Sequence, residues 1–251
     1  MEVPLITDAD EARNVYSQVI AAGACMATLC TENPATTEAI MIAARNVADR
    51  LGIKGLPVVI AFTGHYPGRQ GISYYSLNGD HMEGFLAARD DIERLTRPDG
   101  RFHDLRVMVH LDHAQPGLDR ELIERGRDFF ASVMYDCSTL PLERNMEMTA
   151  EFVKQMKGWF MVEGAVDEIY EAERENAPES GPGPEKNELT TPEDAERFVE
   201  ATGADLIVCN LGTEHRATSR ELKYHSDRAR QISARVGKML VLHGTSSLGR
   251  E

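Results

Sequence analysis

The sequence is poor in cysteine, in aromatic residues and in long apolar runs. Among 251 residues there are four cysteines and one tryptophan, and aromatic residues make up 6% of the chain. No stretch approaches the roughly 20 consecutive apolar residues that a membrane-spanning helix needs, so we expect no membrane partner. Residues 1–11 lack a basic segment followed by an apolar one. They therefore show no secretory signal, and a cytoplasmic location is the default expectation.

Positive charge is also scarce. The chain has 27 basic and 41 acidic residues, which gives a net charge of −14. Proteins bind nucleic acids largely by replacing condensed counterions with Lys and Arg, so this balance argues against a nucleic-acid partner. The four cysteines have neither CxxC nor metal-ligand spacing, and each lies in or beside an apolar run. Buried reduced thiols are the predicted state, with disulfides as the alternative.

What is present is a regular alternation of short apolar runs with longer segments of helical period. The content of 42% hydrophobic and 27% charged residues is typical of a globular chain. The apolar runs contain β-branched residues and little polar alternation, which indicates parallel strands covered on both faces. Seven strands are predicted, at residues 24–29, 57–62, 107–111, 132–135, 159–162, 206–209 and 239–242.

Three of the intervening segments have readable helix ends. Asn33 before Pro34 is a helix start, and Gly52 after Leu51 is a stop. Thr191 before Pro192 repeats the start signal, and Gly203 repeats the stop. Asp8 is a candidate cap for a first helix that runs to about residue 21. We expect helices over 34–51, 193–202 and about 9–21.

The strand-then-helix order predicts an α/β fold with a parallel sheet, either a barrel or a doubly wound sheet. No GxGxxG follows the first strand, and no GxxxxGK[ST] occurs anywhere. The nucleotide-binding, doubly wound version therefore loses its main support. We expect a single (β/α) barrel domain over residues 1–251, of the (β/α)8 TIM-barrel type.

One segment interrupts the alternation of predicted strands and helices. From Gly164 to Glu188 the chain carries eight acidic and two basic residues, and Gly181-Pro182-Gly183-Pro184 lies within it. This composition predicts a mobile acidic loop at about residues 164–190. Long loops after barrel strands are often lids over the active site, but an inert insertion is an equal alternative.

Histidines follow three of the predicted strands. The run Val107-Met-Val-His110-Leu-Asp112-His113 is an apolar strand that ends in polar groups, and His215 and His243 follow two later strands. Strand alternation places His110 and Asp112 on one face and His113 at the tip. In a barrel the three tips share one rim, where three imidazoles and an open fourth position form a catalytic zinc site. Taken alone, His113 could equally be a hydrogen-bonded structural histidine.

At this point the sequence resembles the class II, metal-dependent fructose-bisphosphate and tagatose-bisphosphate aldolase family, over nearly the whole chain. The matching motifs are His110-Leu-Asp-His113, Val133-Met-Tyr-Asp136-Cys-Ser138, Leu140-Pro-Leu-Glu143-Arg-Asn145, the run from Thr191 through Asp205, Gly212-Thr-Glu-His215 and Leu240-Val-Leu-His-Gly244. The resemblance implies a zinc-dependent lyase of carbohydrate metabolism. Such an enzyme reversibly cleaves or forms a C–C bond next to the ketone of a phosphorylated, ketose-like substrate. It also implies a homodimer or homotetramer.

The resemblance also assigns roles to individual residues. His113, His215 and His243 would bind one Zn²⁺, and Asp112 would be the general base. Asp136 matches a carboxylate that can hold a second divalent or monovalent cation, although a helix cap is an equal alternative. Glu173 falls where the family's mobile loop presents a catalytic acid. The alternative is a solvated surface glutamate without a catalytic role. The implied substrate-binding residues are Thr63, Gly212, Gly244, Ser246 and Arg216.

Three departures from the family pattern qualify this hypothesis. Ala165 replaces the second carboxylate of Glu-x-Glu-Leu-Gly, Arg216 replaces a glycine, and Thr245-Ser246-Ser247 replaces Gly-Ser-Gly. They leave two alternatives open: metal-dependent enolisation, epimerisation or specialised condensation, and a non-catalytic metal-binding barrel. The chain also stops at Glu251, before an eighth strand–helix unit. An early end of the given sequence is the favoured explanation, ahead of a second chain or an adapted fold.

Overall fold

The computed structural model describes residues 4–66, 69, 71–171, 189–215, 224–237 and 239–248. The chain divides into two compact units. Unit 1 consists of Met1–Tyr135 and Met156–Val162, and unit 2 consists of Asp136–Gln155 and Glu163–Glu251. Each unit is described by itself.

Unit 1 is built on parallel strands that pair in the order β2 (Thr28–Cys30), β3 (Pro57–Thr63), β4 (Arg106–Ala114) and β5 (Ser132–Tyr135). The short β1 (Leu5–Ile6) also pairs with β4. The register places Thr63 opposite Asp112 and His110 opposite Ser132. Because the strands are parallel, their carboxyl ends gather these polar residues at one edge.

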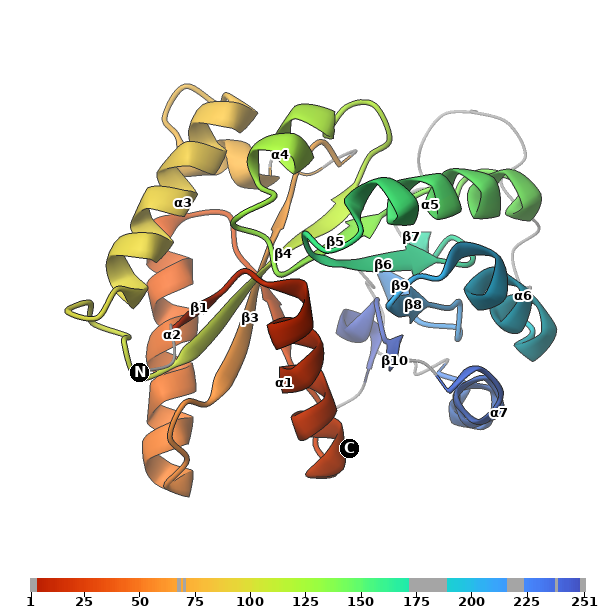
Figure 1. Ribbon diagram of the computed structural model, residues 1–251, viewed down its shortest axis with the longest axis horizontal. Coiled ribbons are helices and arrows are strands. Elements are labelled where there is room, and N and C mark those ends of the chain that lie inside the picture. Colours follow the sequence, from red (N-terminus) through yellow and green to blue (C-terminus); the bar gives the residue numbers. More distant parts are fainter. Residues whose placement is uncertain are drawn as a thin grey trace. The chain divides into compact units, whose positions relative to one another are not determined.

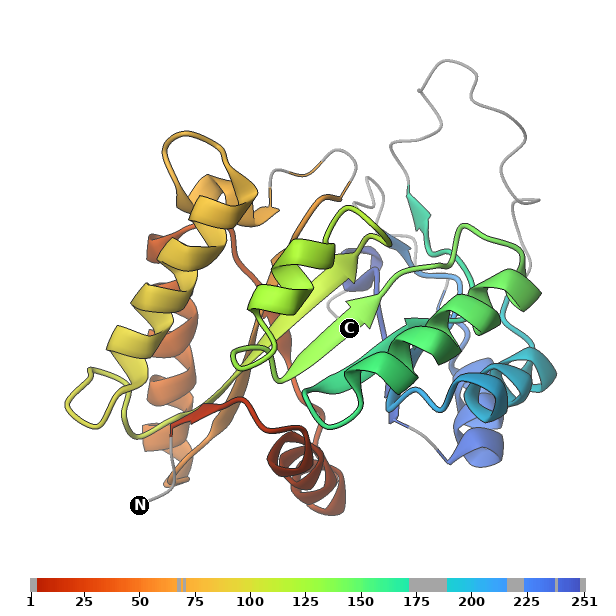
Figure 2. The ribbon, with the colours of Figure 1, turned by 45° about the horizontal axis from the view of Figure 1, so that its top comes forward.

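The helices of unit 1 are α1 (Ala9–Ala21), α2 (Pro34–Leu51), α3 (His81–Thr96) and α4 (Arg120–Arg125), with a 3-10 turn η1 at Gly71–Tyr75. The predicted caps are confirmed: Asp8 accepts from two backbone N–H groups of α1, and Asn33 accepts from Thr36 N. Helices α2 and α3 run side by side (Figures 1 and 2). The Tyr75 hydroxyl joins them through Thr37 Oγ1 at 2.8 Å and Asp91 Oδ2 at 3.2 Å.

The core of unit 1 is strongly aromatic although the chain as a whole is not. Phe85 has its ring 5.9 Å from that of Phe129 and 5.7 Å from that of Phe130, and all three are fully buried. Such tilted aromatic contacts add to the stabilisation that comes from burying large apolar surfaces. This packing joins α3 to the segment that precedes β5.

Unit 2 contains α5 (Leu142–Met156), α6 (Pro192–Thr202), α7 (Ser226–Val236) and the parallel strands β6 (Met161–Ala165), β8 (Leu206–Val208) and β10 (Met239–Val241). Helix α5 and strand β6 each have residues in both units. A separate parallel pair joins β7 (Tyr170–Glu171) to β9 (Glu214–His215), and η3 covers Thr245–Ser247. Figure 1 shows α6 and α7 next to each other, where Arg235 Nε donates to Glu196 Oε2 at 2.8 Å.

Close packing between β6 and α6 explains one glycine of unit 2. A Cβ on Gly164 would lie 2.8 Å from the ring of Phe198, which is fully buried. Any larger residue would push α6 away from the strand. The α6 helix itself starts and stops as predicted: Thr191 accepts from Asp194 N, and Gly203 adopts a left-handed conformation with φ +67°.

The structure corrects several predictions. The first predicted strand, residues 24–29, is displaced to Thr28–Cys30, and β6 extends to Ala165, so the predicted acidic loop does not begin at Gly164. Cys25 and Cys30 are exposed, whereas Cys137 and Cys209 are buried, and all four are free thiols. No helix among the described residues is long and apolar enough to cross a membrane.

Candidate active site

A β-bulge at the end of β4 brings His113 to Asp112. Simple alternation would place these neighbours on opposite faces, but the pairing with β5 shifts register between Leu111 and Ala114, and His113 has a left-handed φ of +52°. As a result the Nε2 atoms of His110 and His113 both lie 3.9 Å from Asp112 Oδ1. Asp112 is therefore a buried carboxylate flanked by two imidazoles.

Each neighbour of Asp112 is fixed by the adjacent strands. Ser132 on β5 lies 2.8 Å from His110 Nδ1, and Thr63 on β3 is the register partner of Asp112. The Cys30 thiol, at the end of β2, donates to Asp112 Oδ2 at 3.8 Å. Although Cys30 as a residue is exposed, its thiol faces Asp112. Burial of the thiol, followed by the negative charge of Asp112, raises the pKa of Cys30 to about 12, so it remains a protonated donor.

The loop that follows β3 is fastened to the loop that follows β4 by one buried carboxylate. Asp119 is fully buried. It accepts hydrogen bonds from the backbone N–H groups of His65, at 2.9 Å, and of Gln115, at 2.7 Å, and its Oδ1 lies 2.8 Å from His65 Nδ1. A Cβ on Gly64 would collide with this carboxylate, so the position requires glycine. Gln115 Nε2 also donates to His113 O at 3.0 Å. Asp119 thus couples the segment after Thr63 to the segment after His113.

Replacing this carboxylate tests its anchoring role. Asp119→Asn puts an amide NH₂ where backbone N–H donors point, and a buried donor left without an acceptor costs about 1–3 kcal/mol. We expect the free energy of unfolding, from urea denaturation, to fall by about that amount. Asp128→Asn is the control, because Asp128 is mostly exposed and its ion pair with Arg89 contributes about 1 kcal/mol or less. Equal stability of Asp119→Asn and wild type would contradict the anchoring role.

Unit 2 brings together two of the predicted metal ligands, His215 and His243. Their ring centroids lie 5.7 Å apart with the planes at 82°, and a ring nitrogen of each lies within 4.8 Å of one on the other. His243 Nε2 is 3.1 Å from Oε1 of Glu163, which is 3% exposed on β6. A histidine whose second nitrogen bonds a carboxylate is the usual arrangement of a metal-binding imidazole.

The backbone around these two histidines is packed tightly. Thr213 Oγ1 donates to the carbonyl of His243 at 2.7 Å, which holds the end of β10 against the turn before β9. Gly244 has a φ of +66°, and a Cβ there would lie within 3.0 Å of the Glu214 backbone. Ser246 Oγ approaches Glu214 O at 3.5 Å. Glycine at position 244 is therefore needed for close approach of two backbone segments.

Two other predicted site residues have local partners in unit 2. Asp136 Oδ1 accepts from Ser138 N at 3.1 Å and from Ser138 Oγ at 2.6 Å, and α5 begins only at Leu142. This turn lies before the helix, so Asp136 is not the cap of α5. Gly212 N donates to Asn210 Oδ1 at 3.0 Å. Glu173 and Arg216 lie outside the described residues.

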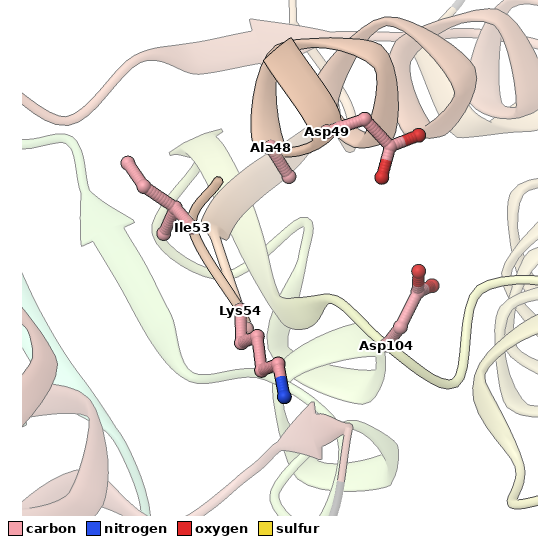
Figure 3. Close-up of a pocket in the computed structure, with 6 residues that line it drawn as sticks. Ala48, Asp49, Ile53, Lys54 and Asp104 are labelled. Carbon is pink, nitrogen blue, oxygen red and sulfur yellow. The ribbon is translucent and has the colours of Figure 1, made fainter. Parts of the chain in front are cut away.

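A hollow of about 430 Å³ lies at the other end of the strands of unit 1. Ala48, Asp49, Ile53, Lys54, Gly55 and Asp104 line it (Figure 3). These residues follow α2 and precede β3 and β4, so the hollow opens at the amino ends of the strands. Barrel enzymes place their chemistry at the carboxyl ends, where Thr63 and Asp112 lie, and we assign no function to the hollow.

Sequence reasoning missed several residues of this region. The Tyr66 ring lies 4.6 Å from the His113 ring, and Cys30 and Asp119 make the contacts described above. Their one local signal is position, since Cys30 ends a strand and Tyr66 lies three residues after Thr63. Glu163 occupies the first carboxylate position of the motif whose second position is Ala165, and its contact with His243 joins residues far apart in the sequence.

The comparisons with known proteins agree with each other. The family model described as "Fructose-bisphosphate aldolase class-II" matches residues 10–251. A fructose-bisphosphate aldolase of Giardia intestinalis is 31% identical over 59% of this chain and 45% of its own length. A sulfofructosephosphate aldolase of Alkalicoccus urumqiensis is 32% identical over 57% of this chain and 48% of its own. The aligned part of the chain thus spans about half the length of these relatives.

Likeness to a solved structure extends further along the chain. The crystal structure of a fructose-bisphosphate aldolase from Campylobacter jejuni matches with a TM-score of 0.69 at 19% identity. The match covers 100% of this chain and 72% of the other. At this identity the likeness establishes the fold.

Proposed function

The chain belongs to the class II fructose-bisphosphate aldolase family, and from this premise we propose that it cleaves or forms a carbon–carbon bond next to a ketone. The family resemblance and the α/β barrel-type fold expected from the sequence are both confirmed. The observation that carries the proposal is the pair His215 and His243 with Glu163 bonded to His243. We propose that His215 and His243 are two of the three ligands of a metal ion, with Glu163 as the hydrogen-bond partner of His243.

The donor set of unit 2 fits a divalent zinc-type ion. Two imidazoles that bind one tetrahedral zinc at about 2.0–2.1 Å place their ring centroids roughly 5 Å apart. The observed separation of 5.7 Å is close to this value. We propose that Nδ1 of His243 binds the ion, because Nε2 is bonded to Glu163. We propose His113 as the third ligand. It lies at the carboxyl end of β4 in unit 1, and His243 likewise follows a strand, β10, in unit 2.

An ion bound by these histidines supplies Lewis-acid polarisation of the substrate carbonyl. The protein's own part is proton transfer. Asp112 would accept the proton of the hydroxyl next to the scissile bond and return it in condensation. Its position is fixed by the Cys30 thiol and by pairing of its strand with β3. Thr63, which is 4% exposed and lies opposite Asp112, would contact the substrate.

Loss of the carboxylate behind His243 should weaken the metal site without destroying it. Glu163→Gln keeps the size of the side chain but removes the charge that orients and strengthens the imidazole. We expect zinc affinity, measured by competition with a chromophoric chelator, to fall about 10–100-fold. Glu151→Gln, an exposed change on α5, is the matched control and should leave affinity unchanged. Unaltered zinc affinity in Glu163→Gln would remove Glu163 from the site.

The reaction is tested by incubating zinc-loaded protein with a panel of phosphorylated ketoses. Cleavage predicts triose products, detected by mass spectrometry. Exchange of a substrate proton with solvent but without cleavage would favour the alternative of enolisation or epimerisation. If neither cleavage nor exchange occurs across the panel, the alternative of a non-catalytic metal-binding barrel is favoured.

Several finer points remain proposals from the family resemblance. We propose a phosphorylated, ketose-like substrate, a homodimer or homotetramer, and a cytoplasmic location. We also propose a second cation at Asp136, a catalytic acid at Glu173, and substrate contacts from Gly212, Gly244, Ser246 and Arg216. The single barrel domain over residues 1–251 is proposed on the same ground.

A further inference from the structure

Within the described part of the chain, five arginines of unit 1 stack on aromatic rings: Arg45, Arg69, Arg89, Arg101 and Arg127. Arg45, Arg89 and Arg101 each lie over a phenylalanine and also donate to a carbonyl or a carboxylate. The Arg69 guanidinium lies 5.4 Å from the centroid of the Tyr66 ring. Within the described part of the chain it has no carboxylate or carbonyl partner. Arg69 itself is half-buried.

The position of Arg69 connects it to the candidate active site. The Tyr66 ring stacks against the Arg69 guanidinium. The centroid of the same ring lies 4.6 Å from that of the His113 ring. The positive charge of Arg69 also acts on Cys30, where it partly opposes burial and Asp112, which raise the pKa of that thiol to about 12. Arg69 therefore lies near the carboxyl ends of β2 and β4, where the proposed base and one proposed metal ligand are found.

The segment that carries Arg69 is anchored at both ends. Gly64 packs against the buried Asp119 carboxylate, and Gly71 packs against the backbone oxygen of Thr63. Arg69 N donates to Tyr66 O at 3.1 Å, which ties the backbone of the arginine to the residue on whose ring it stacks. Arginine presents its donors as a planar fork that suits two oxygens of one oxyanion.

We propose that Arg69 binds the anionic group of the substrate, an oxyanion of the phosphate class, beside the reacting ketone. This inference rests on the proposed function, because it takes the ketone to lie near His113. It adds a binding residue that follows β3 and is bonded through its backbone to Tyr66. A ligand that occupies both places needs its ketone and its oxyanion only a few bonds apart.

Direct binding measurements test this role without requiring turnover. Isothermal titration of the zinc-loaded protein would use dihydroxyacetone phosphate, neutral dihydroxyacetone and inorganic phosphate. In Arg69→Gln we expect affinity for the two phosphates to fall about 10–100-fold, the loss typical of one charge-assisted contact. Affinity for neutral dihydroxyacetone should change by less than about 2-fold, since it has no oxyanion. Arg69→Lys should recover part of the loss, because it keeps the charge but not the fork.

Arg45→Gln is the matched control, since it removes a ring-stacked arginine of the same unit whose partners, the Phe102 ring and the Arg101 carbonyl, precede β4 and do not follow it. It should bind all three ligands as wild type does. Wild-type affinity for the phosphates in Arg69→Gln, or an equal loss for the neutral ketone, would overturn the proposal. So would wild-type protein that binds neither phosphate. If wild type cleaves no ketose but Arg69→Gln still loses phosphate binding, the proposed reaction fails and the anion site stands.

Discussion

Asp112→Asn is expected to reduce turnover by about 10²–10⁴-fold, the contribution typical of a general acid–base group. The substitution preserves size, but it replaces one acceptor oxygen with an NH₂ donor and cannot take up a proton. Asp112 is 6% exposed and 3.9 Å from Nε2 of both His110 and His113, so a neutral amide can occupy its place without enlarging a cavity. Initial rates of ketose phosphate cleavage, with and without added zinc, provide the measurement.

The metal content of the same variant separates chemistry from binding. Zinc by elemental analysis should remain at the wild-type level in Asp112→Asn, because the proposed ligands are unchanged. Near-normal turnover in a zinc-replete Asp112→Asn protein would show that another group removes the proton. Loss of zinc together with activity would instead make Asp112 a part of the metal site.

Substitution of any one proposed ligand should have the second large effect. His113→Ala, His215→Ala and His243→Ala each leave two imidazoles. We expect zinc affinity to fall by more than the roughly 10–100-fold that follows loss of an outer hydrogen-bond partner, with turnover lost in parallel. His103→Ala is the control, since His103 is exposed and its ring nitrogen lies beside the Gly100 carbonyl. Full zinc binding in His113→Ala would mean that the ion is held without unit 1.

Much of the fold could be predicted because it depends on local signals. The helices after Asn33 and Thr191 begin and end where capping chemistry places them. Strand β5 has the predicted bounds, Ser132–Tyr135, since an apolar run there coincides with burial of its first three residues. The two-residue strands β1, β7 and β9 could not be predicted, because each is defined by its pairing partner and not by its own residues.

The candidate site shows where sequence reasoning stops. The predicted residues Thr63, Asp112 and His113 end neighbouring strands, as parallel pairing requires. The left-handed conformation of His113 was not predicted, because a bulge depends on register with the next strand. The bonds from His65 to Asp119 and from His243 to Glu163 join residues 54 and 80 positions apart, and only the folded chain brings them together.

Crystallography of zinc-loaded protein at the zinc absorption edge tests the central claim most directly. The account predicts one strong anomalous peak within about 2.0–2.1 Å of a ring nitrogen from each of His113, His215 and His243. The His243 nitrogen should be Nδ1, because Nε2 bonds Glu163. A peak bound instead by cysteine sulfur, or one that contacts His215 and His243 but not His113, would contradict it.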